Sequence, residues 1–181
     1  MQWTPERNGH DLRARFGKPG HVPLEPFEIA GRFDDVELLN QSSFEQIVGA
    51  SCARELFGRS RDKWSGFVVP VEGLHLIVIN STHPLTRQHA TLMEELFHIT
   101  LRHQPSQIYL CPISGLLRRE YTPEIEKDAY WSAAAALVPY AALKQFVQSG
   151  GTMEAIAETF DVSVDLVEFR MKVTKLWRRR R

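Results

Sequence analysis

Hydrophobic residues recur every three to four positions through most of the chain, a spacing that predicts amphipathic helices. The run SSFEQIVGASCARELF predicts a helix over residues 42–57, which Ser42 or Ser43 can cap and which ends at Gly58. The same spacing predicts helices over 86–103, over 122–148 with a kink at Pro139, over 152–160 and over 163–177. Residues 1–35 lack this periodicity and are rich in proline, glycine and charge, so we expect an irregular leader there.

Two short runs rich in valine and isoleucine predict strands, over 66–71 (GFVVPV) and 74–80 (LHLIVIN). Glu72 and Gly73 between them suit the tight turn of a hairpin. Pro70 favours an edge position for the first strand, because proline has no N–H to donate to a neighbouring strand. Residues 106–121 are expected to form loop or short strand.

The composition fits one globular domain of 181 residues, 43% of them hydrophobic, and excludes a disordered chain or a disulfide scaffold. Residues 170–181 hold seven basic residues and no acidic one, so the rest of this formally neutral chain is acidic, unlike a nucleic-acid-binding core. Cys52 and Cys111 lie far apart and outside any C-x-x-C motif, as expected in the reducing cytoplasm. No apolar run is long enough to span a membrane, and we expect no signal peptide.

Glu94 and His98 lie four residues apart in TLMEELFH and therefore share one face of the helix predicted over 86–103. Apolar residues line that face and also the opposite face, which predicts burial between two layers. A buried carboxylate and a buried imidazole are costly unless they pair or bind a metal. An ordinary i,i+4 Glu–His pair has the same spacing, so both interpretations remain open. Glu95 points about 100° away from Glu94, and on its own it is typical of a solvated helix position.

The helix predicted to begin at Thr122 carries a third candidate ligand. Glu126 stands at the head of a stripe of small residues that includes Ala129 and Ala133, and such a stripe lets two helices approach closely. Glu126 also lies in the first turn, where an acidic side chain interacts favourably with the helix dipole whether or not it binds anything. Taken together with the Glu–His pair of the preceding helix, Glu126 can supply a third inward-facing ligand.

Four further residues carry weaker signals. His89 and His103 flank the metal-ligand positions, and His103 falls on the opposite face of the helix, where a core or surface histidine is expected rather than a ligand. Tyr121 and Tyr130 are near enough to Glu126 in sequence to stabilise an oxyanion, although a packed tyrosine is the simpler interpretation. The chain has no nucleophile elbow, phosphate-binding loop or dinucleotide-binding motif.

Residues 87–98, RQHATLMEELFH, resemble the active-site helix of the ImmA/IrrE family of metallopeptidases, whose typical segment is R-x-x-x-T-x-x-H-E-x-x-H. The later run over 126–139, EKDAYWSAAAALVP, is similar to the family's E-x-x-A…A-x-x-x-L-x-P helix. The strand that ends in Ile79-Asn80-Ser81 and the closing helices fit the same order, so the resemblance covers roughly residues 40–177. It implies an α+β, zincin-like core in which a small antiparallel sheet packs on the active-site helix and C-terminal helices close the fold.

With this resemblance the chain divides into an irregular leader (1–35), a peptidase-like core (36–149) and helix-turn-helix-like helices with a basic tail (150–181). The two helices predicted over 152–160 and 163–177 have the spacing of a helix-turn-helix motif, which also suggests DNA binding as a hypothesis. Asp165 and Glu168, however, occupy the first turns of the would-be recognition helix and would face phosphates. We therefore expect no sequence-specific DNA binding.

By position, the resemblance makes His98 and Glu126 metal ligands and Glu95 the general base, and Glu94 replaces the family's first histidine ligand. Zinc is the ion expected from the family, in which three protein ligands leave a position for an activated water. A second carboxylate ligand favours harder ions such as Mn²⁺ or Fe²⁺. Alternatively, Glu94 hydrogen-bonds to His98 and the site holds no metal.

The resemblance implies two functions. The first is a cytoplasmic metallopeptidase that uses a metal-bound water to hydrolyse a peptide bond in a repressor-like regulator protein, and so controls transcription in a stress response. The second is a catalytically inactive member that binds a protein partner, such as a transcription regulator, and whose metal site is degenerate. Metal binding distinguishes the two.

Overall fold

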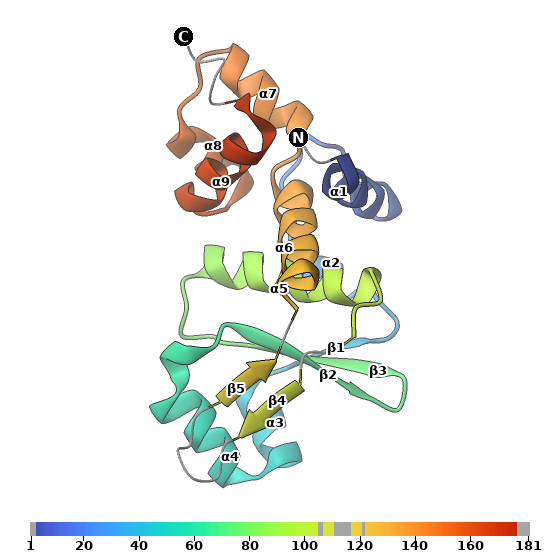
Figure 1. Cartoon of the computed structure of the whole chain (residues 1–181), viewed down its shortest axis with the longest axis vertical. Helices are drawn as coiled ribbons and strands as arrows, with labels where there is room; N and C mark the ends of the chain where they lie inside the picture. Colours follow the sequence, from blue (N-terminus) through green and yellow to red (C-terminus); the bar gives the residue numbers. More distant parts are fainter. Residues whose placement is uncertain (1–2, 105–106, 111–116, 121, 177–181) are drawn as a thin grey trace.

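The computed structural model describes residues 3–104, 107–110, 117–120 and 122–176, which adopt a mixed α+β fold. In chain order the elements are α1 (Trp3–Arg15), α2 (Pro26–Ala30), β1 (Val36–Leu39), α3 (Gln41–Val48), α4 (Ala50–Arg54), η1 (Glu55–Arg59), η2 (Arg61–Lys63), β2 (Gly66–Val71), β3 (Leu74–Ile79), α5 (Leu85–Thr100), β4 (Gln107–Leu110), β5 (Leu117–Glu120), α6 (Pro123–Leu137), α7 (Tyr140–Gln148), α8 (Met153–Phe160) and α9 (Val164–Thr174). Figure 1 shows the layers: α3 and α4 lie below a small sheet, α5 lies above it, and the remaining long helices form a cap.

The small sheet has the strand order β1-β3-β2. β2 and β3 form the predicted hairpin, and Glu72 and Gly73 at its turn have φ values of 49° and 88°. The edge position of β2 confirms the prediction made from Pro70. β1 pairs with β3 in parallel, so the expectation of an antiparallel sheet is wrong and the sheet is mixed. β4 and β5 form a separate antiparallel pair in the region expected to be loop or short strand.

Side chains alternate between the two faces of the sheet, and each face is covered by helices. The face toward α3 and α4 is filled by the cluster of Leu39, Phe44, Ala53, Leu56, Phe67, Leu76 and Val78. On the other face, Ile77 packs into the main core together with Leu92 and Leu96 of α5. All three of these side chains are fully buried. The predicted burial of α5 between two layers is thus confirmed.

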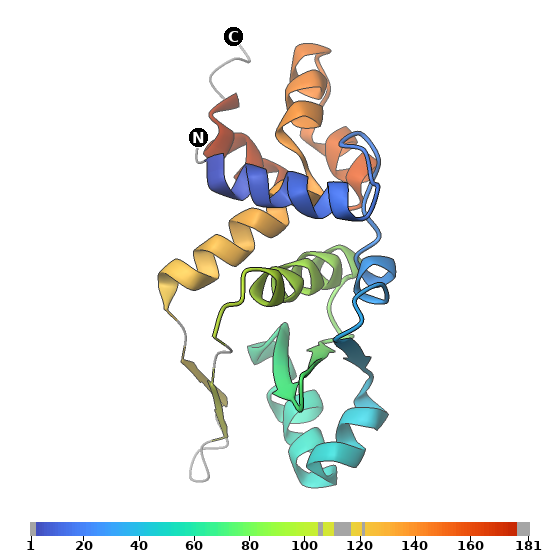
Figure 2. The same cartoon turned by 90° about the vertical axis from the view of Figure 1, so that its right-hand side faces the viewer.

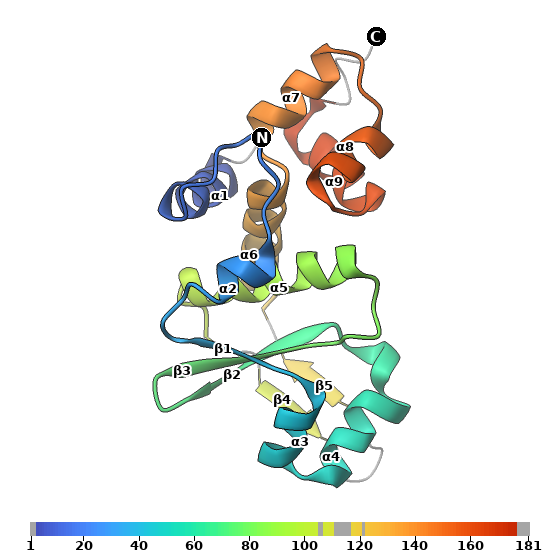
Figure 3. The same ribbon diagram turned by 180° about the vertical axis from the view of Figure 1, so that it is seen from behind.

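α6 packs on the side of α5 that faces away from the sheet, and α1 packs in turn on α6 (Figure 2). Small residues permit this close stacking, because Ala129 and the run 133–136 of α6 are buried alanines. A Cβ added to Gly9 of α1 would lie 2.6 Å from the backbone nitrogen of Ala136, so the contact requires glycine. Figure 3 shows the other side of the molecule, where α2 lies beside α5.

Residues 3–15 and 26–30 form α1 and α2, so the expectation of an irregular leader is wrong for these segments. Buried long-range contacts hold α1 in place. Arg13 donates from Nε to the carbonyl oxygen of Ala136 at 2.6 Å, and Arg170 of α9 pairs with Glu6 through Nη1 and Oε1 at 2.7 Å. The partners are 123 and 164 residues apart in sequence, so no local pattern could reveal them.

The segment predicted as one helix over 42–57 is divided into α3, α4 and the π-helical turn η1. Gly49 causes the division, since its φ of 85° cannot continue an α-helix. Asn40 caps α3 by accepting a hydrogen bond from the backbone N–H of Ser43, in the role expected of Ser42 or Ser43.

The C-terminal helices follow the predicted pattern. α6 and α7 are separated at Pro139, and α8 and α9 are separated by a turn in which Asp161 is left-handed, with a φ of 49°. Ser163 caps α9 by accepting from the backbone N–H of Leu166. None of the helices in the described part of the chain is both long and apolar enough to cross a membrane.

Candidate metal centre

Glu94, His98 and Glu126 come together where α6 packs on α5. α5 carries the first two four residues apart, on the same face, and α6 carries Glu126 in its first turn. The side chain of His98 is 9% exposed and that of Glu126 is 20% exposed, because the two helices cover them. The packing of the two helices therefore creates a polar site within an apolar core.

Each of these three residues offers one ligand atom, and the three atoms lie within 4.8 Å of one another. His98 Nε2 lies 3.6 Å from Glu126 Oε1, which is an ion-pair distance but too long for a hydrogen bond. The same nitrogen is buried and has no hydrogen-bond partner among the described residues. Ligands of one ion lie about 2 Å from it and so close to one another. The predicted convergence is confirmed, while the role of the three as ligands stays a prediction.

The surroundings of His98 favour positive charge. Burial by itself lowers the pKa of His98, but the carboxylates of Glu126, Glu95 and Glu94 together outweigh burial, so that this pKa is raised. A field that stabilises a proton on the imidazole also stabilises a cation among the same carboxylates. A proton and a metal ion would therefore compete for His98 Nε2.

Glu95 is buried, with 3% of its surface exposed. The interpretation of Glu95 as a solvated helix residue is therefore wrong. The reason is that α5 is covered on both faces, so that a residue pointing away from Glu94 is still enclosed. Its negative charge contributes to the raised pKa of His98. Glu95 thus adds a carboxylate to the electrostatic environment of the site.

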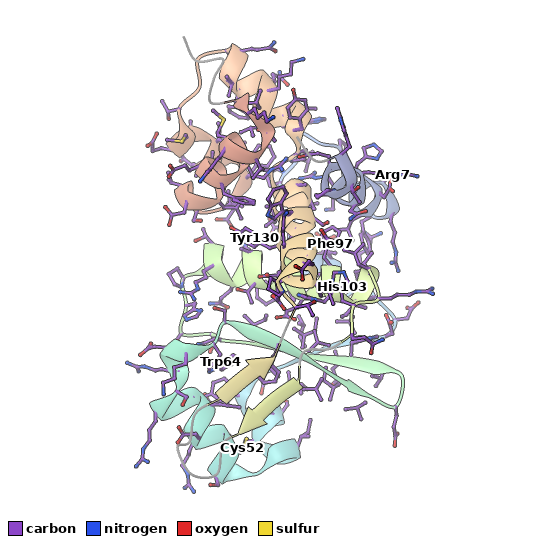
Figure 4. The ribbon with its side chains drawn as sticks, viewed as in Figure 1. Arg7, Cys52, Trp64, Phe97, His103 and Tyr130 are labelled. Carbon is purple, nitrogen blue, oxygen red and sulfur yellow. The ribbon has the colours of Figure 1, made fainter. Side chains whose placement is uncertain are left out.

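Tyr130 lies on α6, half-buried, with its ring centroid 4.9 Å from that of Phe169 (Figure 4). This packing agrees with the simpler interpretation of a core tyrosine. Burial, together with the negative charges of Glu94 and Asp165, raises the pKa of Tyr130, so its hydroxyl remains a hydrogen-bond donor at neutral pH. Tyr121, the second tyrosine considered, lies outside the described residues.

His103 contacts His98, which the sequence did not indicate. The Nδ1 atoms of the two rings are 3.2 Å apart, and the ring centroids are 5.1 Å apart at an interplanar angle of 72°. The prediction that His103 lies on the helix face opposite to His98 is wrong. It assumed a helix to residue 103, whereas α5 ends at Thr100 and Arg102 then adopts a left-handed φ of 55°. Burial and the neighbouring His98 lower the pKa of His103.

His89 has a structural environment of its own, away from the three candidate ligands. It is 4% exposed, its Nδ1 lies 3.2 Å from Asp161 Oδ2, and its ring meets that of Phe27 edge-on. These contacts tie the first half of α5 to the turn between α8 and α9. A core or surface histidine was expected here in preference to a ligand, and the burial of His89 agrees with the core alternative.

A cavity of about 480 Å³ lies beside His98 on the side of the sheet. Asp35, just before β1, and His75 of β3 line it on one side. His98 of α5 and the residues Arg102 and His103, just after α5, line it on the other. His75 Nδ1 lies 3.4 Å from Asp35 Oδ2, so these two residues form an ion pair when the imidazole is protonated. The site therefore adjoins a space with polar walls.

Comparison with known proteins extends the resemblance seen in the sequence. The model of the peptidase M78 family, described as the IrrE N-terminal-like domain, matches residues 58–172, which is more than half of the chain. No curated protein and no solved structure gives a significant match. The matched region runs from η1 to α9 and includes both helices that carry the candidate ligands. The chain thus belongs to the peptidase M78 family of IrrE N-terminal-like domains.

Proposed function

We propose that this protein is a metal-dependent peptidase that hydrolyses a peptide bond in a regulator protein, with Glu94, His98 and Glu126 as metal ligands. The observation that carries the proposal is the convergence of three ligand-type side chains from two helices within 4.8 Å. Membership of a peptidase family supports the reaction class. The cytoplasm is the proposed location.

The three residues fit a divalent cation. His98 Nε2 is a buried nitrogen without a hydrogen-bond partner among the described residues, and it lies beside the Glu126 carboxylate. One neutral imidazole and two carboxylates together neutralise a divalent charge in a site where an unpaired charge would be costly. Zinc accepts nitrogen and oxygen ligands of this kind, and the second carboxylate increases the relative preference for Mn²⁺ or Fe²⁺.

Each residue then has a defined task. When bound, the metal would act as a Lewis acid toward a peptide carbonyl and would lower the pKa of water. The Glu95 carboxylate, enclosed next to the ligands, would accept a proton from the attacking water and return it to the leaving amine. The Tyr130 hydroxyl would donate a hydrogen bond to the developing oxyanion, as a secondary contribution. The cavity beside His98 would receive part of the substrate.

The proposed substrate is a protein, of which a transcriptional repressor is the leading candidate. A role in a stress response is proposed on the same basis. We do not propose sequence-specific DNA binding, because Asp165 in the first turn of α9 and the exposed Glu168 would repel phosphates.

Metal content provides the primary test. Protein purified without chelator and loaded in turn with Zn²⁺, Mn²⁺ or Fe²⁺ should bind about one ion per chain. Glu126→Ala should abolish this binding. Glu124→Ala is the matched control, because Glu124 lies in the same first turn of α6 but is exposed. Absence of binding under every loading condition would instead support the catalytically inactive, partner-binding alternative.

The role of Glu95 requires a second measurement. Glu95→Gln should keep the metal and lose hydrolysis of a degenerate peptide library analysed by mass spectrometry, because an amide cannot accept the proton from water. Hydrolysis by Glu95→Gln at the wild-type rate would exclude Glu95 as the base. Loss of metal by this variant would assign Glu95 to binding.

A further inference from the structure

The two ring nitrogens of His98 face two different partners. Nε2 points toward the carboxylates of the site and lies 3.6 Å from Glu126 Oε1. Nδ1 points the other way and lies 3.2 Å from His103 Nδ1, at hydrogen-bond distance. The imidazole of His98 is therefore held from both ends.

Only one proton can lie between the two Nδ1 atoms, so one nitrogen donates and the other accepts. A histidine that binds a metal through Nε2 uses the lone pair of that nitrogen and must carry its proton on Nδ1. His103 Nδ1 is then the acceptor, and its own ring proton is on Nε2. We propose that His103 is a positioning residue that fixes the tautomer and ring orientation of His98 for metal binding, an inference that rests on the proposed function.

The backbone supports this arrangement. The N–H of His103 donates to the carbonyl oxygen of His98 at 2.8 Å, and that of Arg102 donates to Ile99 at 2.9 Å, which together form a Schellman turn. Arg102 supplies the required left-handed residue, with a φ of 55°. The Schellman turn at the end of α5 thus places the His103 ring against the imidazole of His98, in the last turn of the helix.

The cavity next to His98 explains why His98 Nδ1 needs a side-chain hydrogen-bond acceptor. His98 and His103 both line this space of about 480 Å³, so without His103 the Nδ1 of His98 would face the cavity. A water molecule there could accept a hydrogen bond but would not fix the ring. Metal ligands that lose such an outer hydrogen-bond partner typically bind about 10- to 100-fold more weakly.

Two substitutions separate the hydrogen bond from packing. His103→Leu keeps bulk and an apolar contact suited to this position of a Schellman turn, but it removes the acceptor. His103→Asn restores an acceptor oxygen near the position of Nδ1. His75→Leu is the matched control, because His75 lines the same cavity without contacting His98 in any described interaction. Circular dichroism and thermal melting would verify that all three variants fold.

Calorimetric titration with Zn²⁺ should show affinity reduced about 10- to 100-fold in His103→Leu. Affinity should stay within about threefold of wild type in His103→Asn and in His75→Leu. Nitrogen-15 NMR of the zinc-loaded protein should show the His98 proton on Nδ1 in wild type. Equal affinity of His103→Leu and wild type, or His98 bound through Nδ1, would overturn the inference.

The outcomes distinguish this inference from the proposed function. A wild-type protein that binds no ion under any loading condition overturns both. A protein that loses its ion on Glu126→Ala but keeps wild-type affinity on His103→Leu overturns only the positioning role of His103.

Discussion

The buried ion pair between Glu6 and Arg170 should be a main determinant of stability, although the two residues lie 164 positions apart. Arg170 is 1% exposed. Its guanidinium meets the Glu6 carboxylate through two contacts, of 2.7 Å and 3.0 Å, and donates a third hydrogen bond of 2.9 Å to the carbonyl oxygen of Val138. The pair thus connects α1, the end of α6 and α9. Glu6→Gln should keep the shape of this contact and remove its negative charge.

The expected cost follows from the burial of the charge that remains. Glu6→Gln leaves the Arg170 guanidinium as an uncompensated cation in the core, and breaking such pairs costs about 3–5 kcal/mol. The lower end, about 3 kcal/mol, applies here because the Glu6 side chain is 13% exposed and glutamine still accepts a hydrogen bond. For a chain of this size, that corresponds to a melting temperature lower by about 6–12 °C.

Urea unfolding of wild type and Glu6→Gln, followed by tryptophan fluorescence, measures the difference. Asp11→Asn is the control on the same helix, since Asp11 pairs with Arg7 at 3.8 Å and both side chains are more than half exposed. That surface pair should contribute no more than about 0.5 kcal/mol. The double variant Glu6→Gln/Arg170→Met should recover part of the loss, because it also removes the unpaired cation. Equal effects of Glu6→Gln and Asp11→Asn would refute the reasoning.

Further predictions concern the metal site and the backbone. Glu94→His should raise zinc affinity at least about tenfold in calorimetry, because imidazole suits zinc better than a second carboxylate; unchanged affinity would show that Glu94 is not a ligand. Zinc affinity should fall about tenfold per pH unit below the raised pKa of His98, because a proton must leave before the metal binds; a flat profile would contradict His98 as a ligand. Arg102→Gly should stabilise the protein by about 0.5–1 kcal/mol in urea unfolding, because glycine adopts the left-handed φ of 55° without strain; destabilisation would mean that the arginine side chain matters more. Gly9→Ala should destabilise by about 1–3 kcal/mol in the same assay, because its Cβ would lie 2.6 Å from the backbone of α6; an unchanged midpoint would contradict the close packing.

In the region matched to the peptidase family, local sequence patterns predicted the hairpin and the helix face that carries two of the candidate ligands. The hairpin of β2 and β3 was predictable because Glu72-Gly73 suits a tight turn and Pro70 cannot lie in a central strand. The shared face of Glu94 and His98 follows from the geometry of any α-helix. Glu126 was inferred as a third inward-facing residue from the stripe of small residues that follows it, and the family resemblance added its role as a ligand. The match of residues 58–172 to the peptidase M78 family covers Glu126 as well. The structure confirms that the three come within 4.8 Å of one another.

Other features depended on contacts between distant parts of the chain. α1 is a polar segment whose helix is held by the partners of Arg13 and Glu6 on α6 and α9, and β1 is a strand because β3 lies parallel beside it. His103 was misplaced for a different reason: one left-handed residue at Arg102 ends the helix early and reverses the direction of the side chain that follows.

The sequence by itself therefore determined the periodic elements, the hairpin and the face on which Glu94 and His98 lie, because those depend on neighbours within a few residues. Tertiary structure alone decided the helical N-terminus, the parallel strand, the burial of Glu95 and the contact of His103 with His98. These features depend on which surfaces cover one another and on where a helix stops, and both are settled by the free energy of the whole packed chain.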